Sequence, residues 1–217
     1  MKQRLIIFNT EMVRAILDGR KTQTRRPMNP QPHKEWQPLS AKAEWYTPTV
    51  IDKKGFYQPA KNDVFGVSDE DQGFISPFGS IGDQLYVRET WRKFNSSDEC
   101  GCSESPCSCP SNGTVLFKAS HDSGESKWKP SIHMPRWAAR IILEVTDVRV
   151  ERVQNISERD AWAEGFDGYD DDVTGGKNGY SEFCEAWQSI YGDESWQSNP
   201  WVWVIDFKVI STTGGAA

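Results

Sequence analysis

Apolar residues occur only in short runs in this chain, and this feature most restricts how the chain can fold. The longest unbroken runs, such as Leu5–Phe8 and Trp201–Ile205, are only four to five residues long in a chain of 217 residues. A helix that spans a bilayer needs roughly 18 consecutive apolar residues, so we expect no membrane span. Short apolar runs of this kind are typical of buried strands.

The composition predicts an ordered, cytoplasmic protein. Ten Trp, ten Phe and six Tyr residues argue against intrinsic disorder. A single domain of this length buries roughly 70% of its unfolded surface, which is enough for a core without disulfides. Leu5–Phe8 is too short for the apolar region of a signal peptide, and an acidic, helix-like segment follows it.

Hydrophobic periodicity predicts one strand, one helix, several strands, two helices and a last strand. The first helix is expected to be capped by Asn9 or Thr10, and the last helix, Ser181–Tyr191, to bury Phe183, Trp187 and Ile190. The strands are expected at Arg4–Phe8, Gln84–Trp91, Val115–Ala119, Arg140–Val153 and Trp201–Ile210. Strands and helices seldom alternate, so a doubly wound parallel sheet is not expected. The prediction is an α+β fold, a small and mostly antiparallel β-barrel with flanking helices.

Two polar segments interrupt this pattern. Residues 27–80 are rich in Pro, Gly, Lys and Asp, and they are expected to form a long insertion with a hairpin around Trp45–Gln58. Residues 93–113 form a second insertion. We therefore predict a single domain over residues 1–210, carrying both insertions, and a disordered tail over residues 211–217.

Charge is distributed unevenly along the chain. The formal net charge of −6 argues against a protein that coats nucleic acid nonspecifically. Residues 1–30 nevertheless carry seven Lys or Arg and two acids, whereas residues 160–194 carry ten Asp or Glu and one Lys. This split predicts either one anion-facing surface on an acidic body or two solvated faces of opposite charge.

Four of the five cysteines fall within ten residues, as Cys100, Cys102, Cys107 and Cys109. In a cytosolic chain such a cluster favours metal binding over disulfides, and four thiolates suit a tetrahedral zinc ion. The C-x-C spacing is tighter than the usual zinc chelate, so a reduced, flexible loop is the alternative. Cys184 lies in a helical pattern and is expected in the core.

Lys21 and Thr24 are the first candidates for chemistry, and three arginines, Arg20, Arg25 and Arg26, surround them. A Thr hydroxyl is a weak nucleophile unless a base lies beside it, and burial or a neighbouring cation can turn a Lys into that base. The arginines can also hold a phosphate or another anion. The alternative is a basic helix C-terminus, where these side chains offset the helix dipole.

The segment from Phe8 to Arg26, with G-R-K-T-Q-T-R at residues 19–25, resembles the signature of the ASCH domain family. The similarity continues at residues 82–91, Ile141–Val153, Ile156–Glu164 and Trp201–Lys208, and it covers roughly half of the chain. The segment Lys129–Trp137 also resembles ASCH proteins of prophages and tailed phages of enteric bacteria. The resemblance implies a PUA-like β-barrel, related to domains that bind modified bases.

The resemblance also implies an activity. A small bacterial ASCH enzyme hydrolyses N4-acetylcytidine with a Lys and a Thr of this motif and a Glu of a later helix. The matching residues are Lys21, Thr24 and Glu164. Thr24 is then the nucleophile, Lys21 its activator, and Glu164 orients Lys21 or relays the proton. Catalysis by this machinery requires no cofactor.

Other residues are candidates for substrate binding. They are Arg20, Arg25, Arg26, Glu89, His133 and Arg136. For each of them a structural or exposed position is the alternative. Five Trp residues lie near loops or strand ends, and one or two of them can stack on a base: Trp36, Trp45, Trp91, Trp128 and Trp137. For each single Trp, packing in the protein is the alternative.

Several functions therefore stay open. The leading one is hydrolysis of the N4-acyl amide of a modified cytidine, as a nucleoside or within RNA or DNA. The alternatives are a noncatalytic module that binds a modified base in RNA or DNA, a ribonuclease, and a phage accessory protein that binds a host protein.

Overall fold

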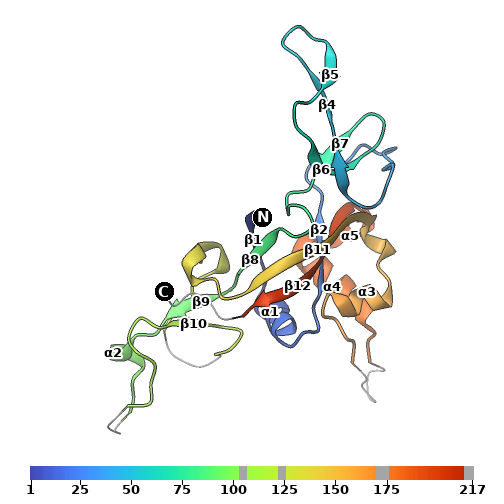
Figure 1. The fold of residues 1–217 in the computed structure, drawn as a ribbon. Helices are drawn as coiled ribbons and strands as arrows, with labels where there is room; N and C mark the ends of the chain where they lie inside the picture. The colour runs from blue at the N-terminus through green and yellow to red at the C-terminus, as the bar shows by residue number, and fades with distance from the viewer. Residues whose placement is uncertain (103–106, 122–125, 170–175, 213–217) are drawn as a thin grey trace.

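A five-stranded sheet forms the centre of the computed structural model, which describes residues 1–102, 107–121, 126–169 and 176–212 (Figure 1). Its strands, in spatial order, are β1 (Gln3–Ile7), β8 (Gln84–Arg88), β11 (Ile142–Arg152), β12 (Trp201–Ser211) and β2 (Gln23–Pro27). Only β1 and β8 run parallel, and the other neighbours in this sheet are antiparallel. The protein is therefore a mixed α+β structure with several, mostly antiparallel, sheets.

The predicted barrel is not closed in the described part of the chain. No backbone ladder joins the two edge strands, β1 and β2, among the residues that the structure describes. A side chain bridges these edges instead, because Arg26 donates from Nη2 to the carbonyl oxygen of Ile7 at 2.6 Å. The expected mostly antiparallel α+β architecture is present, but a closed barrel is not seen among the described residues.

Strand β12 is covered on both faces up to Phe207, whereas Lys208, Val209 and Ile210 are exposed. Trp203, Ile205 and Phe207, which alternate along the strand, face the main core. Val202 and Val204 face a second apolar cluster, which is completed by helix side chains. Two covered faces explain why this strand is almost continuously apolar.

Sequence signals fix the helix ends. Helix α1 (Thr10–Leu17) begins where Asn9 Oδ1 accepts from the Met12 amide at 2.8 Å, and Gly19 at φ +76° follows its last turn. Helix α3 (Glu158–Ala163) begins with a capping box. Helices α4 (Gly179–Tyr191) and α5 (Asp193–Gln197) complete the second cluster, and Figure 1 shows these two with α3 on one side of the sheet.

One helix position was predicted wrongly. Phe183 and Trp187 are buried in α4, but Ile190 is 51% exposed. The buried face of α4 continues from Trp187 to Tyr191, four residues later, and the two rings lie 4.5 Å apart. Ile190 comes one residue before Tyr191 on the helix, so it lies at the edge of the core with about half of its surface exposed.

The first polar segment, residues 27–80, contributes to the main core. Strands β3 (Glu44–Tyr46), β6 (Val64–Ser68) and β7 (Gly73–Ile75) form a three-stranded sheet. Trp36 is buried, and its ring lies 5.0 Å from that of Trp201. Residues 41–43 also pair with β11, where the Ala43 amide donates to the Val148 carbonyl at 2.8 Å. The predicted hairpin is seen as β4 (Thr49–Ile51) and β5 (Tyr57–Pro59), which project from the body in Figure 1.

The second polar segment also projects from the body in Figure 1. The predicted strand Gln84–Trp91 is divided, because β8 ends at Arg88 and β9 (Trp91–Lys93) pairs with a different partner, β10 (Val115–Phe117). The short helix α2 (Ser96–Glu99) lies between β9 and β10, and three 3-10 turns occupy Ser131–His133, Arg136–Ala138 and Val153–Asn155.

Two predictions concern the membrane and the chain end. Among the described helices, none has the length and apolar content that a bilayer crossing requires. Residues 213–217 of the predicted tail lie outside the described residues, whereas β12 includes Ser211. The division into one domain with two insertions stays a prediction.

Candidate functional site

The local fold brings Lys21 directly against Glu164. The amides of Arg20 and Lys21 both donate to the Ala15 carbonyl, so the chain turns sharply after α1. The Thr22 amide then donates to the Ala163 carbonyl at 2.8 Å, which holds this turn beside the end of α3. Lys21 Nζ donates to Glu164 Oε2 at 2.7 Å and to the Glu164 carbonyl oxygen at 2.9 Å. Both side chains are almost fully buried.

Arg25 is the second cation that contacts Glu164. It lies on β2 and is buried, and its Nη1 is 3.4 Å from Glu164 Oε1. Its Nη2 lies 3.0 Å from Glu151 Oε2 and 3.6 Å from Asp160 Oδ2. Three carboxylates therefore surround one buried guanidinium. We call Lys21, Arg25, Glu151, Asp160 and Glu164 the buried ion cluster.

Sequence reasoning did not single out Glu151 and Asp160 as members of this cluster. Glu151 faces the same way as Arg149 on β11, and Arg149 Nε donates to Glu151 Oε1 at 2.6 Å. The one signal in the sequence is this pair of opposite charges two residues apart on a strand. Asp160 belongs to the capping box of α3, where its Oδ2 accepts from the Ser157 amide at 3.2 Å, and the same oxygen lies 3.6 Å from Arg25 Nη2.

Burial dominates the electrostatics of Lys21. Loss of hydration on complete burial lowers its pKa below the ordinary 10.5, and the nearby charges of Arg26 and Arg25 act in the same direction. Glu164 acts in the opposite direction through its charge and its hydrogen bond. The net direction is downward, so the neutral amine is more accessible here than in a solvated Lys.

Thr24 is one of the residues that line a small, mostly apolar cavity. This cavity measures about 20 Å³, and Thr24, Arg25, Arg26 and Glu164 share its lining with apolar residues. The apolar lining residues are Met12, Phe166, Phe183, Ala186, Trp187, Ile190 and Tyr191. Thr24 itself is 1% exposed.

A larger cavity of about 430 Å³ adjoins the small one. The two cavities share Met12, Glu164, Phe166 and Ala186. The larger cavity lies between α1, the residues after α3 and α4, and its volume is within the range of small-molecule sites. Lys21 lines neither of these two cavities, so it reaches this region through Glu164.

The two oppositely charged segments of the chain meet in this region. Arg20 lines the larger cavity, where its Nη1 lies 3.0 Å from Asp167 Oδ2 and its Nη2 lies 3.3 Å from Asp18 Oδ2. Arg26 is half-buried over the Phe8 ring, at 5.2 Å. Together with the Lys21 and Arg25 pairs, these contacts show that acids of residues 160–167 neutralise part of the basic motif.

Glu89, His133 and Arg136 lie elsewhere in the described structure. Glu89 is buried, and both its oxygens accept from Arg140 at 2.9 Å. Burial raises the pKa of Glu89, and Arg140 opposes this shift. His133 and Arg136 are exposed on the 3-10 turns, and Arg136 donates to Gln3 Oε1 at 2.6 Å. None of the three lines the two cavities described above.

Arg136 belongs to a surface where cations lie over aromatic rings. Arg136 and Arg88 lie 4.8 and 5.9 Å from the Tyr86 ring, Lys129 lies 5.1 Å from Trp91, and Lys93 lies 5.4 Å from Trp137. The Trp91 and Trp137 rings meet edge-on at 6.2 Å. We call these residues the cation–aromatic face: Tyr86, Arg88, Trp91, Lys93, Lys129, Arg136 and Trp137. Among described residues, none of its four cations forms an ion pair with a carboxylate.

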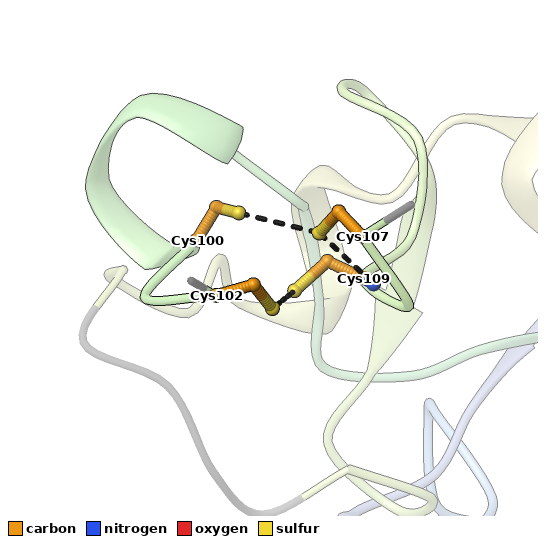
Figure 2. Close-up of side chains that lie close together, drawn as sticks. All are labelled: Cys100, Cys102, Cys107 and Cys109. Carbon is orange, nitrogen blue, oxygen red and sulfur yellow. Dashed lines mark hydrogen bonds between the residues drawn. The ribbon is translucent and has the colours of Figure 1, made fainter. Parts of the chain in front are cut away.

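The four clustered cysteines converge near the end of the second polar segment (Figure 2). Their sulfur atoms all lie within 4.8 Å of one another. Soft thiolates in this number could form a zinc site.

Comparison with known proteins adds one weak structural likeness. No family model matches this sequence. No curated protein matches it either. The crystal structure of protein EF3133 from Enterococcus faecalis V583, described under the family model DUF984, aligns with a TM-score of 0.39 and 12% sequence identity. The alignment covers 97% of this chain and 82% of that chain.

Gly165 allows the close approach of α1 and the Glu164 segment, and this can be tested. Its φ is +90°, and a Cβ there would lie 2.8 Å from Ala15 Cβ and 3.2 Å from Lys21 Cβ. Gly82 has a similar φ of +86°, but a Cβ at that position would meet no atom within 4 Å. Both Gly→Ala changes incur the conformational cost, but only Gly165→Ala also clashes.

We expect Gly165→Ala to lower the free energy of unfolding in urea by about 1–3 kcal/mol more than Gly82→Ala does. Equal losses of unfolding free energy in Gly165→Ala and Gly82→Ala would contradict the close contact of Gly165 with Ala15 and Lys21.

Proposed function

We propose that the protein is an ASCH-type hydrolase with a PUA-like fold, acting on the N4-acyl amide of a modified cytosine. The observation that carries this proposal is the buried contact between Lys21 and Glu164. The motif resemblance assigns both residues to catalysis, and they are 143 positions apart in the chain. Thr24, the third matching residue, lines a cavity with Glu164.

In the proposed reaction the Thr24 oxygen attacks the acyl carbonyl carbon, and Lys21 accepts the hydroxyl proton. The tetrahedral intermediate collapses, the carbon–nitrogen bond breaks, and Lys21 returns the proton to the departing N4 amine. Water then hydrolyses the Thr24 ester, which releases a carboxylic acid and restores the hydroxyl. Arg25 or a backbone amide stabilises the oxyanion.

The contacts favour Lys21 over Glu164 as the proton acceptor. A neutral amine has two hydrogens, and two Glu164 oxygens accept from Nζ. The nitrogen lone pair is then not used by Glu164, and the proposal requires it to reach the Thr24 hydroxyl. Glu164 lies between Lys21 and Arg25, so protonating it would weaken both interactions. We therefore assign Glu164 to positioning Lys21.

Removal of the Thr24 hydroxyl tests the covalent step. We expect Thr24→Val to reduce hydrolysis of N4-acetylcytidine by about 1,000-fold or more, because the nucleophile is lost while the side-chain shape is kept. Loss of the acetyl group can be followed by mass spectrometry. Thr22→Val is the matched control, since Thr22 is exposed two positions away.

Hydrolysis that continues unchanged in Thr24→Val would exclude this mechanism. RNA cleavage by the parent protein, without deacylation, would support the ribonuclease alternative instead.

The pH dependence tests the role of Lys21. A neutral base requires kcat/KM to rise with pH through the pKa of Lys21, and burial places this rise below the ordinary 10.5. Glu164 raises the pKa of Lys21, so Glu164→Gln is expected to move the rise to lower pH. Lys21→Arg keeps the charge but cannot act as a base, and we expect a loss of about 100-fold or more.

Activity of Lys21→Arg within tenfold of the parent would exclude the base role. A pH profile of kcat/KM that is unchanged in Glu164→Gln would contradict the coupling between Lys21 and Glu164.

The cation–aromatic face favours a second candidate function, binding of single-stranded RNA or DNA. Its cations lack carboxylate partners among the described residues, and Trp137 is 53% exposed. Phosphates would contact the cations, and bases would stack on the exposed aromatic surface. This function does not require catalysis, although the face could also present a polymeric substrate to the protein.

A labelled single-stranded oligoribonucleotide tests this binding by fluorescence anisotropy. Trp137→Ala is expected to weaken binding by about 5- to 150-fold through lost stacking. Lys93→Ala combined with Lys129→Ala is expected to reduce the slope of log K against log salt by about one to two.

Trp45→Ala is the matched control, because Trp45 is 62% exposed on β3 and outside this face. Equal effects of Trp45→Ala and Trp137→Ala would contradict a defined binding face.

A further inference from the structure

We propose that Cys100, Cys102, Cys107 and Cys109 bind one structural zinc ion. Each of the two C-x-C pairs contributes both of its sulfurs, and the pairs face each other across the end of the projecting segment (Figure 2). Cys100 Sγ lies 3.4 Å from Cys107 Sγ, and Cys102 Sγ lies 3.1 Å from Cys109 Sγ. This site is separate from the buried ion cluster and from both cavities.

The sulfur spacing fits a single tetrahedral ion. Zinc–sulfur bonds of about 2.3 Å give a tetrahedron with sulfur–sulfur edges of about 3.8 Å. The observed separations, from 3.1 Å to at most 4.8 Å, bracket this value. The atoms therefore need to move by only a fraction of an ångström to reach the coordination geometry.

Two other states of the cysteines fit less well. Disulfides at the two close pairs would require sulfur separations of about 2.05 Å, well below the observed 3.1 and 3.4 Å. They would also join the sulfurs in two separate bridges, whereas all four converge on one point. An iron–sulfur cluster would spread its cysteines around several irons.

A backbone donor supports the thiolate form. The Cys109 amide points at Cys107 Sγ, with a nitrogen–sulfur distance of 3.4 Å. Hydrogen bonds of this kind orient thiolate ligands and compensate part of their negative charge. Four ligands from the protein leave no open coordination position, so the role is structural rather than catalytic.

The surrounding segment lacks the apolar core that would otherwise hold it. We call β9, α2, β10 and the described residues between them the cysteine arm. Its buried apolar side chains are Trp91, Phe94 and Leu116, all near the base of the arm; α2 adds no buried apolar residue, and its Glu99 pairs with the buried Arg92. Across the described part of the arm, backbone pairing ends where Phe94 bonds to Gly113 and Thr114. A metal ion beyond this point would fix the end of the arm, as in small domains that fold around zinc.

Elemental analysis of the full-length protein, purified under reducing conditions without chelator, tests the proposal. We expect about one equivalent of zinc in the parent protein. Cys107→Ser combined with Cys109→Ser is expected to lower this to below about a tenth of an equivalent, because two ligands are lost. Cys184→Ser is the matched control, since Cys184 is a half-buried cysteine of α4, and it should retain the metal.

Cobalt binding to the parent protein provides a test that does not depend on the folding of variants. After removal of zinc, one equivalent of Co²⁺ should give the intense visible absorption of a tetrahedral thiolate complex, and added Zn²⁺ should abolish it.

Three results would overturn the proposal. The first is less than a tenth of an equivalent of zinc in the parent protein together with no cobalt spectrum. The second is a denatured mass that shows two disulfides among these cysteines. The third is stoichiometric iron in place of zinc.

Discussion

The burial of Lys21, Arg25 and Glu164 constrains the rest of the body. Each of these groups would be costly to bury alone, so each requires a partner at a fixed distance. Those partners come from β2, β11 and α3, elements that are far apart in the sequence. Removing one member of such a buried pair typically costs about 3–5 kcal/mol, because the remaining charge stays without compensation. The ends of α1 and α3 are therefore held together by electrostatics as well as by packing. This leaves little freedom to move the cluster without loss of stability.

The same cluster explains the uneven charge of the chain. The sequence left open whether the basic motif faces an anion or only solvent, and neither alternative describes Lys21 and Arg25. Acids from the later part of the chain reach them, and Arg20 pairs with Asp167 at the rim of the larger cavity. A substrate anion at this rim would compete with the Asp167 carboxylate for Arg20. The cations of the cation–aromatic face have no such competitor among the described residues, which is why a polyanion is better suited to that face.

Residue patterns in the sequence were sufficient to predict features that depend only on neighbouring residues, such as a helix cap or a strand. The sequence offered Asn9 or Thr10 as the cap of the first helix, and Asn9 is the cap; the last strand also lies where its apolar pattern predicts it. The sequence could not show that Trp36 packs against Trp201, because this contact joins a segment without clear periodicity to the last strand. The pairing of Glu89 with Arg140 and the roles of Glu151 and Asp160 were missed for the same reason. For Lys21 and Glu164 the motif resemblance supplied the residues, and the structure supplies their contact; their catalytic role stays a prediction.

The position of Thr24 has a consequence for any reaction at its hydroxyl. The cavity beside it, at about 20 Å³, has room for about one water molecule and none for an acyl group. The larger cavity is separated from it by residues common to both linings, of which Met12 is the most adaptable, with three rotatable bonds and no branching. Lys21 and Arg25 are fixed by their ion pairs, so the movement that admits a substrate must come from the apolar side of the cavity. Opening on that side would bring the acyl carbon to Thr24 while the charged groups stay in place. Closing it again would exclude bulk water while the Thr24 oxygen attacks, and reopening would admit the water that hydrolyses the ester.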